Sequence, residues 1–362
     1  MDNTNIEKAF FYLLKTGLWG EGKRNEAFFS LSDDEWSSLY KRAREQTVEA
    51  ILYDGILRLR PENLPPRLLQ IKWSVQVDRI ERRNQLANKH IAEQYEFFIG
   101  HGLQPLLLKG QGLAATYANP SHRVCGDIDW YFERKEELAL ARLQLTKLGV
   151  PKLLEGSQVY LWKESELDLH DRLFDLYNPF SKKILKQLRK DFPDTTAAID
   201  GKQIPILAPQ VQVLQVAAHI LKHSLAFGVG LRQFCDLASL YNKYSAELEG
   251  ERLNQIYNRL GLSRWFTAVH QLLVDNIGLP KEMLPFPVSK TPSSLAIIDE
   301  VWTVGNFGFH DTSNMEKIEG DYMLRKNRTA TLTKRLLKYF PYVPKEAFWF
   351  PFIHFFNGVK DR

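Results

Sequence analysis

The chain has 362 residues, of which 44% are hydrophobic and 25% are charged, and its net charge at neutral pH is +5. This apolar content excludes an intrinsically disordered protein, and the length predicts two or three domains or subdomains. The two cysteines, Cys125 and Cys235, are too few and too far apart for a disulfide framework or a four-cysteine zinc site. The weak positive charge suits a phosphate-rich substrate without demonstrating one.

Neither end of the chain predicts a membrane protein. The first ten residues, MDNTNIEKAF, contain acidic residues and have no apolar run after a basic start, which argues against a signal peptide. The aromatic segment Ala347–Phe356 is about half the ~20 residues that a spanning helix needs, and it contains Pro351. We therefore expect a cytoplasmic protein without stable membrane insertion, and the oligomeric state stays open.

Residues 5–100 have the apolar period of helices. Ser32 and Glu35 have the spacing of a capping box, which predicts a helix start. A long amphipathic helix is predicted over 66–100, where Gly100 and Gly102 end it. These features predict a helical N-terminal subdomain over residues 1–102.

The next hundred residues alternate short apolar runs with turns and one helical segment, which predicts a small sheet flanked by helices over residues 103–207. Glycines at 110 and 112 form the turn after its first strand. The expected elements are strands over 104–109, 127–132, 158–163 and 166–170, with the last two as a hairpin, and a helix over 135–148.

From Pro209 onward the apolar period is again helical, which predicts a helical C-terminal subdomain over 208–362. The expected helices cover residues 211–225, 231–244, 248–260, 264–277 and 293–304.

Three carboxylates lie on the predicted strands. Asp127 and Asp129 are two residues apart, so both should project from one face while Ile128 points into the core. Asp168 lies between Leu167 and Leu169 in another strand, which would bring a third carboxylate to the same patch. Like charges this close are costly unless a cation neutralises them, and oxygen ligands without thiolates favour Mg²⁺ or Mn²⁺ over zinc. The alternative is that Asp127 and Asp129 merely flank a turn.

Several motifs together resemble those of a known family, the uncharacterised bacterial nucleotidyltransferase-like family within the polymerase-beta-type nucleotidyltransferase superfamily. The likeness covers most of the chain, including the helical lead-in and the helical C-terminal half. The matching text is Leu108-Lys-Gly110, Arg123-Val-Cys-Gly-Asp-Ile-Asp129, Leu167-Asp-Leu-His170, His219-Ile-Leu-Lys-His223 and Leu231-Arg-Gln-Phe-Cys-Asp236.

The resemblance implies an α+β fold with a small mixed nucleotidyltransferase-type sheet between helical N-terminal and C-terminal subdomains. It also implies that Asp127 and Asp129 are the paired metal ligands, and that Asp168 activates the acceptor hydroxyl or holds a second metal. The implied reaction moves a nucleoside monophosphate from a nucleoside triphosphate (NTP) to a hydroxyl-bearing acceptor and releases pyrophosphate. The acceptor is unknown: a small molecule, a protein or an RNA. The alternative is a catalytically silent nucleotide-binding or interaction module with the same fold.

On the phosphate side of this implied site, Gly110 would let backbone amides approach the triphosphate, and Lys109 would add a positive charge. The wider superfamily usually has a Gly-Ser pair at this turn, so the phosphate contacts here are expected to differ. Arg123 is expected to contact a phosphate or to form a structural ion pair. His170 is expected to orient a carboxylate, to touch the base or to serve as a hydrogen-bonded structural residue. Lys109 could also be a solvent-exposed residue at a strand end.

His219 and His223 share one face of a predicted helix, four residues apart. This spacing suits a metal, but hydrogen bonding with Asp236 across two packed helices is the preferred interpretation. Contacts of Lys222, His223 or Arg232 with a nucleotide or acceptor are a further possibility.

Two basic clusters could follow an RNA backbone or could simply be solvated faces. Residues 182–190 hold five cations, and residues 325–345 hold seven cations and no acid.

Overall fold

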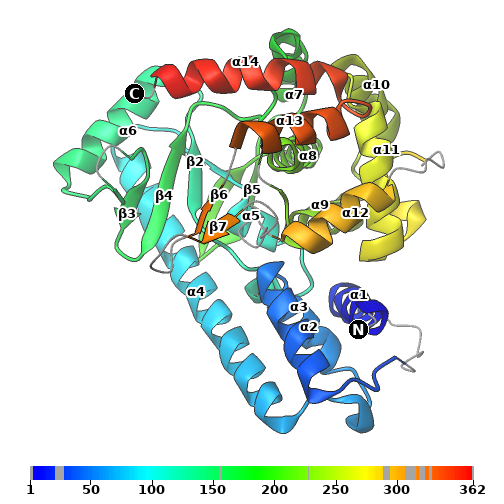
Figure 1. Ribbon diagram of the computed structural model, residues 1–362. Coiled ribbons are helices and arrows are strands. Elements are labelled where there is room, and N and C mark those ends of the chain that lie inside the picture. Colours follow the sequence, from blue (N-terminus) through cyan, green and yellow to red (C-terminus); the bar gives the residue numbers. More distant parts are fainter. Residues whose placement is uncertain are drawn as a thin grey trace. The chain divides into compact units, whose positions relative to one another are not determined.

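The computed structural model describes residues 3–20, 28–154, 157–226, 228–287, 294–305, 315–317, 323–325 and 328–360 (Figure 1). Its contacts group the chain into two compact units, which are described separately below. Unit 1 contains residues 1–43, 48–173 and 192–212, and unit 2 contains residues 44–47, 174–191 and 213–362. The predicted boundaries at 102/103 and 207/208 stay predictions.

The N-terminal part of unit 1 is helical, as predicted. Ser32 and Glu35 form the capping box, because the Ser32 amide donates to Glu35 Oε2 at 2.8 Å and the Glu35 amide donates to Ser32 Oγ at 3.3 Å. Helices α1 and α3 cross closely at Gly17, where a Cβ would lie 1.9 Å from Ile51 O. The helices are α1 (Asn3–Trp19), α2 (Asp33–Glu45), α3 (Glu49–Ile56) and α4 (Arg67–Gly100).

A six-stranded mixed sheet follows among the described residues, in the order β3-β4-β2-β1-β6-β5. β2 pairs in parallel with β4, β1 pairs in parallel with β6, and the other three pairs are antiparallel. The α+β prediction and the β3–β4 hairpin are therefore confirmed. The strands are β1 (Leu106–Leu108), β2 (Ile128–Tyr131), β3 (Tyr160–Trp162), β4 (Ser165–His170), β5 (Thr195–Ile199) and β6 (Lys202–Ile206), with α5 (Gly110–Ala114) and α6 (Lys135–Lys147) between them.

One face of this sheet packs into the core of unit 1. Leu107, Trp130 and Leu169 from three strands are buried with Phe98 of α4 and Leu145 of α6. Because successive strand residues alternate between faces, the residues between these apolar ones point to the opposite face of the sheet. The alternation thus separates the apolar core from the carboxylate side.

The β5–β6 hairpin was not predicted. Asp200 and Gly201 join its strands with positive φ angles of 47° and 75°, which is the geometry of the tight Asp-Gly hairpin turn. Only one face of β5 carries buried residues, Ala197 and Ile199, so the apolar signal of this strand is weak.

Unit 2 is mainly helical. The short segment 44–47 belongs to it because Gln46 Nε2 donates to Val301 O and the Leu231 amide donates to Gln46 Oε1. Its helices are α7 (Lys182–Asp191), α8 (Pro209–Ala226, whose first turn lies in unit 1), α9 (Leu231–Tyr244), α10 (Gly250–Leu260), α11 (Ser263–Leu272), α12 (Ser294–Val304), α13 (Arg328–Tyr339) and α14 (Pro344–Lys360), with the strand pair β7 (Met315–Lys317) and β8 (Met323–Arg325).

The predicted C-terminal helices are thus confirmed, although α11 ends at Leu272 and a π-helical turn covers Leu273–Ile277. In the part of the chain that the structure describes, no helix combines the length and the apolar character needed to span a bilayer.

Candidate functional site

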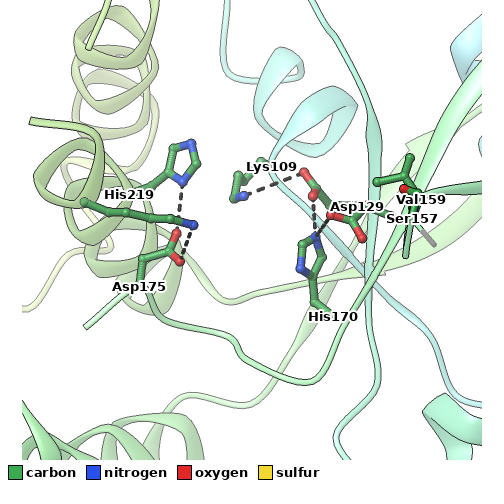
Figure 2. Close-up of polar contacts among 9 residues, drawn as sticks. Lys109, Asp129, Ser157, Val159, His170, Asp175 and His219 are labelled. Carbon is green, nitrogen blue, oxygen red and sulfur yellow. Dashed lines mark hydrogen bonds and ion pairs between the residues drawn. The ribbon is translucent and has the colours of Figure 1, made fainter. Parts of the chain in front are cut away.

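Three polar side chains converge on the face of the sheet opposite the core. Asp129 of β2 lies in register with Asp168 of the parallel strand β4, and His170 follows two residues later on the same face. His170 Nε2 lies 2.5 Å from Asp129 Oδ1 and 3.4 Å from Asp168 Oδ2 (Figure 2). One ligand atom from each of these residues lies within 4.8 Å of the others. This arrangement offers two oxygens and one nitrogen to a cation.

Lys109 adds a positive charge to this cluster. Its Nζ lies 3.7 Å from Asp129 Oδ2, and Figure 2 shows the lysine and His170 on two sides of the same carboxylate. Asp129 is nearly buried, with 6% of its side chain exposed, whereas Lys109, Asp168 and His170 stay partly accessible. Asp129 is therefore the anchor of the cluster, and the other three residues line its accessible side.

Charge coupling within the cluster is strong. Burial lowers the pKa of His170, but the hydrogen bond and charge of Asp129, with the charge of Asp168, outweigh this and raise its pKa overall. The charge of Asp129 also raises the pKa of Asp127, and Lys109 opposes that rise. A raised carboxyl pKa beside a second carboxylate is the expected result of excess negative charge, which a bound cation would relieve.

Asp127 differs from the sequence prediction in one respect. Strand β2 begins at Ile128, so Asp127 lies just before the strand and is exposed, whereas Asp129 is buried within it. The expectation that one strand carries both carboxylates is wrong at its first residue. Among the described residues, the group of converging ligand atoms contains His170 and does not include Asp127.

The turn after β1 has an unusual backbone. Lys109 has φ 47° and ψ −133°, and Gly110 has φ 41°. The first of these conformations is common only for glycine, so Lys109 is held in a strained geometry. A Cβ on Gly110 would lie 3.7 Å from Asp127 O, which places this turn directly beside the entry to β2.

Asn84 of α4 forms hydrogen bonds with two chain segments that border the carboxylate cluster. Its Nδ2 donates to Ser121 O at 2.6 Å and to Arg123 O at 2.9 Å, in the loop that leads to Asp127. Gln111, next to the Gly110 turn, donates in turn to the backbone and side-chain oxygens of Asn84, each at 3.2 Å. One α4 residue thus fixes the two segments that flank the carboxylates. No local pattern around Asn84 predicts this role.

Arg123 lies within the protein. It is 4% exposed, and its Nη1 lies 3.0 Å from Cys125 Sγ. These contacts favour a structural role for Arg123 over a phosphate contact.

A second polar cluster lies in unit 2. Asp175 accepts hydrogen bonds from His219 Nδ1 at 3.0 Å and from Lys222 Nζ at 2.9 Å (Figure 2). The rings of His219 and His223 meet edge to face, 4.3 Å apart. The residue that joins His219 to Lys222 is thus Asp175, which was not predicted because it lies in an irregular segment between β4 and α7. Asp236 of α9 is buried.

Of the comparisons with known proteins, the family match supports the nucleotidyltransferase interpretation. No curated protein matches the chain. One solved structure that is similar to it is the crystal structure of an antigenic nucleotidyltransferase-like protein from Paracoccidioides brasiliensis. That protein is 14% identical, and the match covers 56% of this chain and 93% of that one with a TM-score of 0.31. The family described as uncharacterised nucleotidyltransferase matches residues 32–275, two thirds of the chain and all of the carboxylate cluster, and the chain therefore belongs to that family.

Proposed function

We propose that the protein is a Mg²⁺- or Mn²⁺-dependent nucleotidyltransferase that moves a nucleoside monophosphate from an NTP to a hydroxyl-bearing acceptor. The observation that carries this proposal is the convergence of Asp129, Asp168 and His170 beside the Lys109-Gly110 turn, in a chain of the nucleotidyltransferase family. The acceptor is a small molecule, a protein side chain or an RNA end. Both cysteines are buried free thiols, which suits a reducing cytoplasm.

The residues present fit a hard divalent cation. Asp129 and Asp168 supply carboxylate oxygens from adjacent strands, and Asp127 contributes further negative charge through space. His170, when neutral, supplies a nitrogen that Mn²⁺ accepts more readily than Mg²⁺ does. When bound, such a cation would neutralise the triphosphate and polarise the α-phosphoryl group.

Residues of the chain itself are proposed to hold the triphosphate and to accept the proton of the acceptor. Lys109 and the side-chain-free backbone at Gly110 are proposed to hold the triphosphate. Asp168, which is 26% exposed, is proposed to accept the proton of the acceptor hydroxyl. The acceptor oxygen then bonds to the α-phosphorus, the bond from that phosphorus to the bridging oxygen breaks, and pyrophosphate leaves.

One observation favours the alternative of a silent nucleotide-binding module. Lys109 contacts Asp129 directly, and the usual Gly-Ser pair is absent from this turn, so part of the negative charge is already neutralised. A module that binds nucleotide without transfer would retain the fold and the cation site.

The first test measures binding and turnover separately. Isothermal titration with each of the four NTPs in the presence of Mg²⁺ or Mn²⁺ should detect metal-dependent binding. Asp129→Asn should abolish this binding, because it removes the buried carboxylate to which His170 and Lys109 are bonded. Asp171→Asn is the matched control, since Asp171 is exposed just beyond β4 and should behave like the wild type.

Turnover is followed with α-labelled NTP and pools of the three acceptor classes. Asp168→Asn should lower transfer by about 10²-fold or more if this residue is the base. Binding without transfer to any acceptor would favour the silent module. If no NTP binds with either metal and Asp129→Asn equals Asp171→Asn, the cluster is not a nucleotide site.

A further inference from the structure

An exposed aromatic cluster lies on unit 2. Phe180 is 76% exposed, Phe348 is 53% exposed and Phe352 is 49% exposed, although rings of this size are usually buried. Trp349 joins them, with ring-centroid distances of 6.3 Å to Phe180, 5.4 Å to Phe348 and 6.3 Å to Phe352. These four rings form one continuous surface, which we call the aromatic platform.

The aromatic platform has a firm base. Glu346 of α14 is buried and accepts hydrogen bonds from the backbone amides of Tyr177, at 2.6 Å, and Asn178, at 3.2 Å. The rings of Tyr177 and Phe350 pack edge to face, 4.7 Å apart. These contacts join α14 to the segment that leads through Phe180 into α7, and Figure 1 shows α7 and α14 at the same end of unit 2. The exposed rings are therefore held in place by buried polar and aromatic contacts.

Lysines continue this surface along α7. Lys182, Lys183, Lys186 and Lys190 are exposed, and three of them are spaced four residues apart along one face of the helix. Asp191, the acid at the end of α7, is bonded to Arg252. The first turn of the helix holds Lys182 and Lys183 and no acid, a placement that the helix dipole disfavours.

We propose that the aromatic platform and the α7 lysines bind a single-stranded polynucleotide. Exposed aromatic rings stack on unpaired bases, and neighbouring lysines neutralise the phosphates between them. Such a surface binds strands of any base sequence, because every base has a flat face that can stack on an aromatic ring. The proposal does not rest on nucleotidyl transfer, since the residues that carry it lie outside the carboxylate cluster.

The orientation of α7 favours a polynucleotide over an anionic membrane. An amphipathic helix that lies in a membrane surface carries apolar side chains, aliphatic or aromatic, on the face opposite its basic residues. Leu188 of α7 is buried, and Ile184 and Leu185 are partly buried, so the helix presents lysines and no exposed aliphatic face. The aromatic platform, the apolar part of the surface, lies on α14 and at Phe180 and not on α7 itself.

The test is fluorescence anisotropy with labelled RNA and DNA strands of about 12 nucleotides, within the usual range of site sizes. Phe180→Ala, Phe348→Ala and Phe352→Ala should each weaken binding about fivefold or more and leave its salt dependence unchanged. The triple variant Lys182→Gln, Lys183→Gln, Lys186→Gln should instead lower the slope of log K against log salt, by about 0.7 for each lost phosphate contact. A duplex of the same length should bind more weakly, because its bases are already stacked.

The controls carry matched changes in unit 1. The triple variant Lys8→Gln, Lys135→Gln, Lys147→Gln removes three exposed lysines, and Leu57→Ala with Leu68→Ala removes two exposed apolar side chains. Both should bind RNA like the wild type, and circular dichroism of every variant verifies folding.

Equal affinity of the platform variants and the controls overturns the proposal. The proposal is also overturned if the protein binds phosphatidylserine vesicles, or dimerises through the rings, and binds no polynucleotide. Nucleotidyl transfer to a small molecule by a protein that binds no polynucleotide would refute this inference and leave the proposed function intact.

Discussion

At the scale of single residues, the backbone of Lys109 connects stability to the proposed site. A lysine at φ 47° and ψ −133° costs about 1–3 kcal/mol relative to a relaxed conformation. Its Nζ nevertheless reaches Asp129, and its carbonyl accepts the Leu113 amide at 3.2 Å in the first turn of α5. Strain that persists beside a cluster of charges suggests that the lysine is kept for its charge.

Lys109→Gly separates these two effects. Glycine relieves the strained dihedrals but is freer in the unfolded chain, so the net gain in the free energy of unfolding should be about 1 kcal/mol, or roughly 2–4 °C in Tm. Metal-dependent NTP binding should weaken at the same time, because the charge that faces Asp129 is lost. Calorimetry and isothermal titration measure the two quantities.

Lys163→Gly is the matched control for this prediction. Lys163 also has a positive φ, 55°, and forms an ion pair, 2.7 Å from Glu93, but it lies in the turn between β3 and β4. Its replacement should raise Tm with no change in NTP binding. If Lys109→Gly leaves NTP binding unchanged, or if both variants weaken it equally, Lys109 has no specific role.

The sequence predicted the carboxylates better than it predicted their partners. The alternation around Asp129 and Asp168 placed both on one face, because apolar neighbours fix the register of a half-buried strand. The predicted start of the second strand, at Asp127, was wrong by one residue, because strand ends depend on pairing with neighbouring strands. The contacts of Asn84 and Asp175 join residues 37 and 44 positions apart, and no local pattern encodes them.

At the scale of secondary-structure elements, His122 joins two helices to the loop that leads toward β2. Its Nδ1 lies 2.7 Å from Asp54 Oδ2 of α3, and its Nε2 lies 2.9 Å from Glu81 Oε1 of α4. Burial alone would lower the pKa of His122, but the hydrogen bonds and charges of Asp54 and Glu81 raise it above its usual 6.5. A charged imidazole can donate from both nitrogens, which this position between two carboxylates requires.

The stability of unit 1 should therefore depend on pH through His122. Because its folded-state pKa lies above the unfolded value of 6.5, its contribution is fully present below 6.5 and is lost as pH rises through the folded-state pKa. A folded-state pKa that lies one pH unit above the unfolded value corresponds to 1.36 kcal/mol in the free energy of unfolding. Urea unfolding of the wild type between about pH 6 and pH 9 should show this decline, and His122→Gln should show a shallower one, which leaves the part that comes from the raised pKa of His170. His101→Gln, which replaces an exposed histidine at the end of α4, should retain the decline, and a similar slope in both variants would contradict the assignment.

Elements with strong local signals were predicted well, and weak ones were not. Helix α9 lies over the predicted residues Leu231–Tyr244, because apolar residues such as Phe234, Ala238 and Tyr241 recur at helical spacing. Strand β5, by contrast, reads Thr-Thr-Ala-Ala-Ile and has little apolar alternation. The Asp200-Gly201 pair was the available signal, since this dipeptide favours the tight hairpin turn that the structure contains.

At the scale of the whole molecule, the chain passes repeatedly between its two units. Unit 2 takes residues 174–191 from between β4 and β5 of the sheet, and residues 44–47 from the end of α2 and the turn that follows it. The carboxylate cluster belongs wholly to unit 1, and the aromatic platform belongs wholly to unit 2. The two proposed ligands should therefore act on different parts of the chain.

Hydrogen exchange measured by mass spectrometry tests this separation. A ligand that binds the native state slows exchange in the elements that hold it, because it lowers the population of locally opened forms. Mg²⁺ with the NTP that binds best should protect β1, β2, β4 and the Lys109-Gly110 turn, whereas a single-stranded RNA should protect α7 and the first turns of α14. Asp129→Asn should remove the first pattern and leave the second, and the triple lysine variant of α7 should do the reverse. If either variant removed both patterns, the ligands would share one binding site, and the assignment of two independent sites would be wrong.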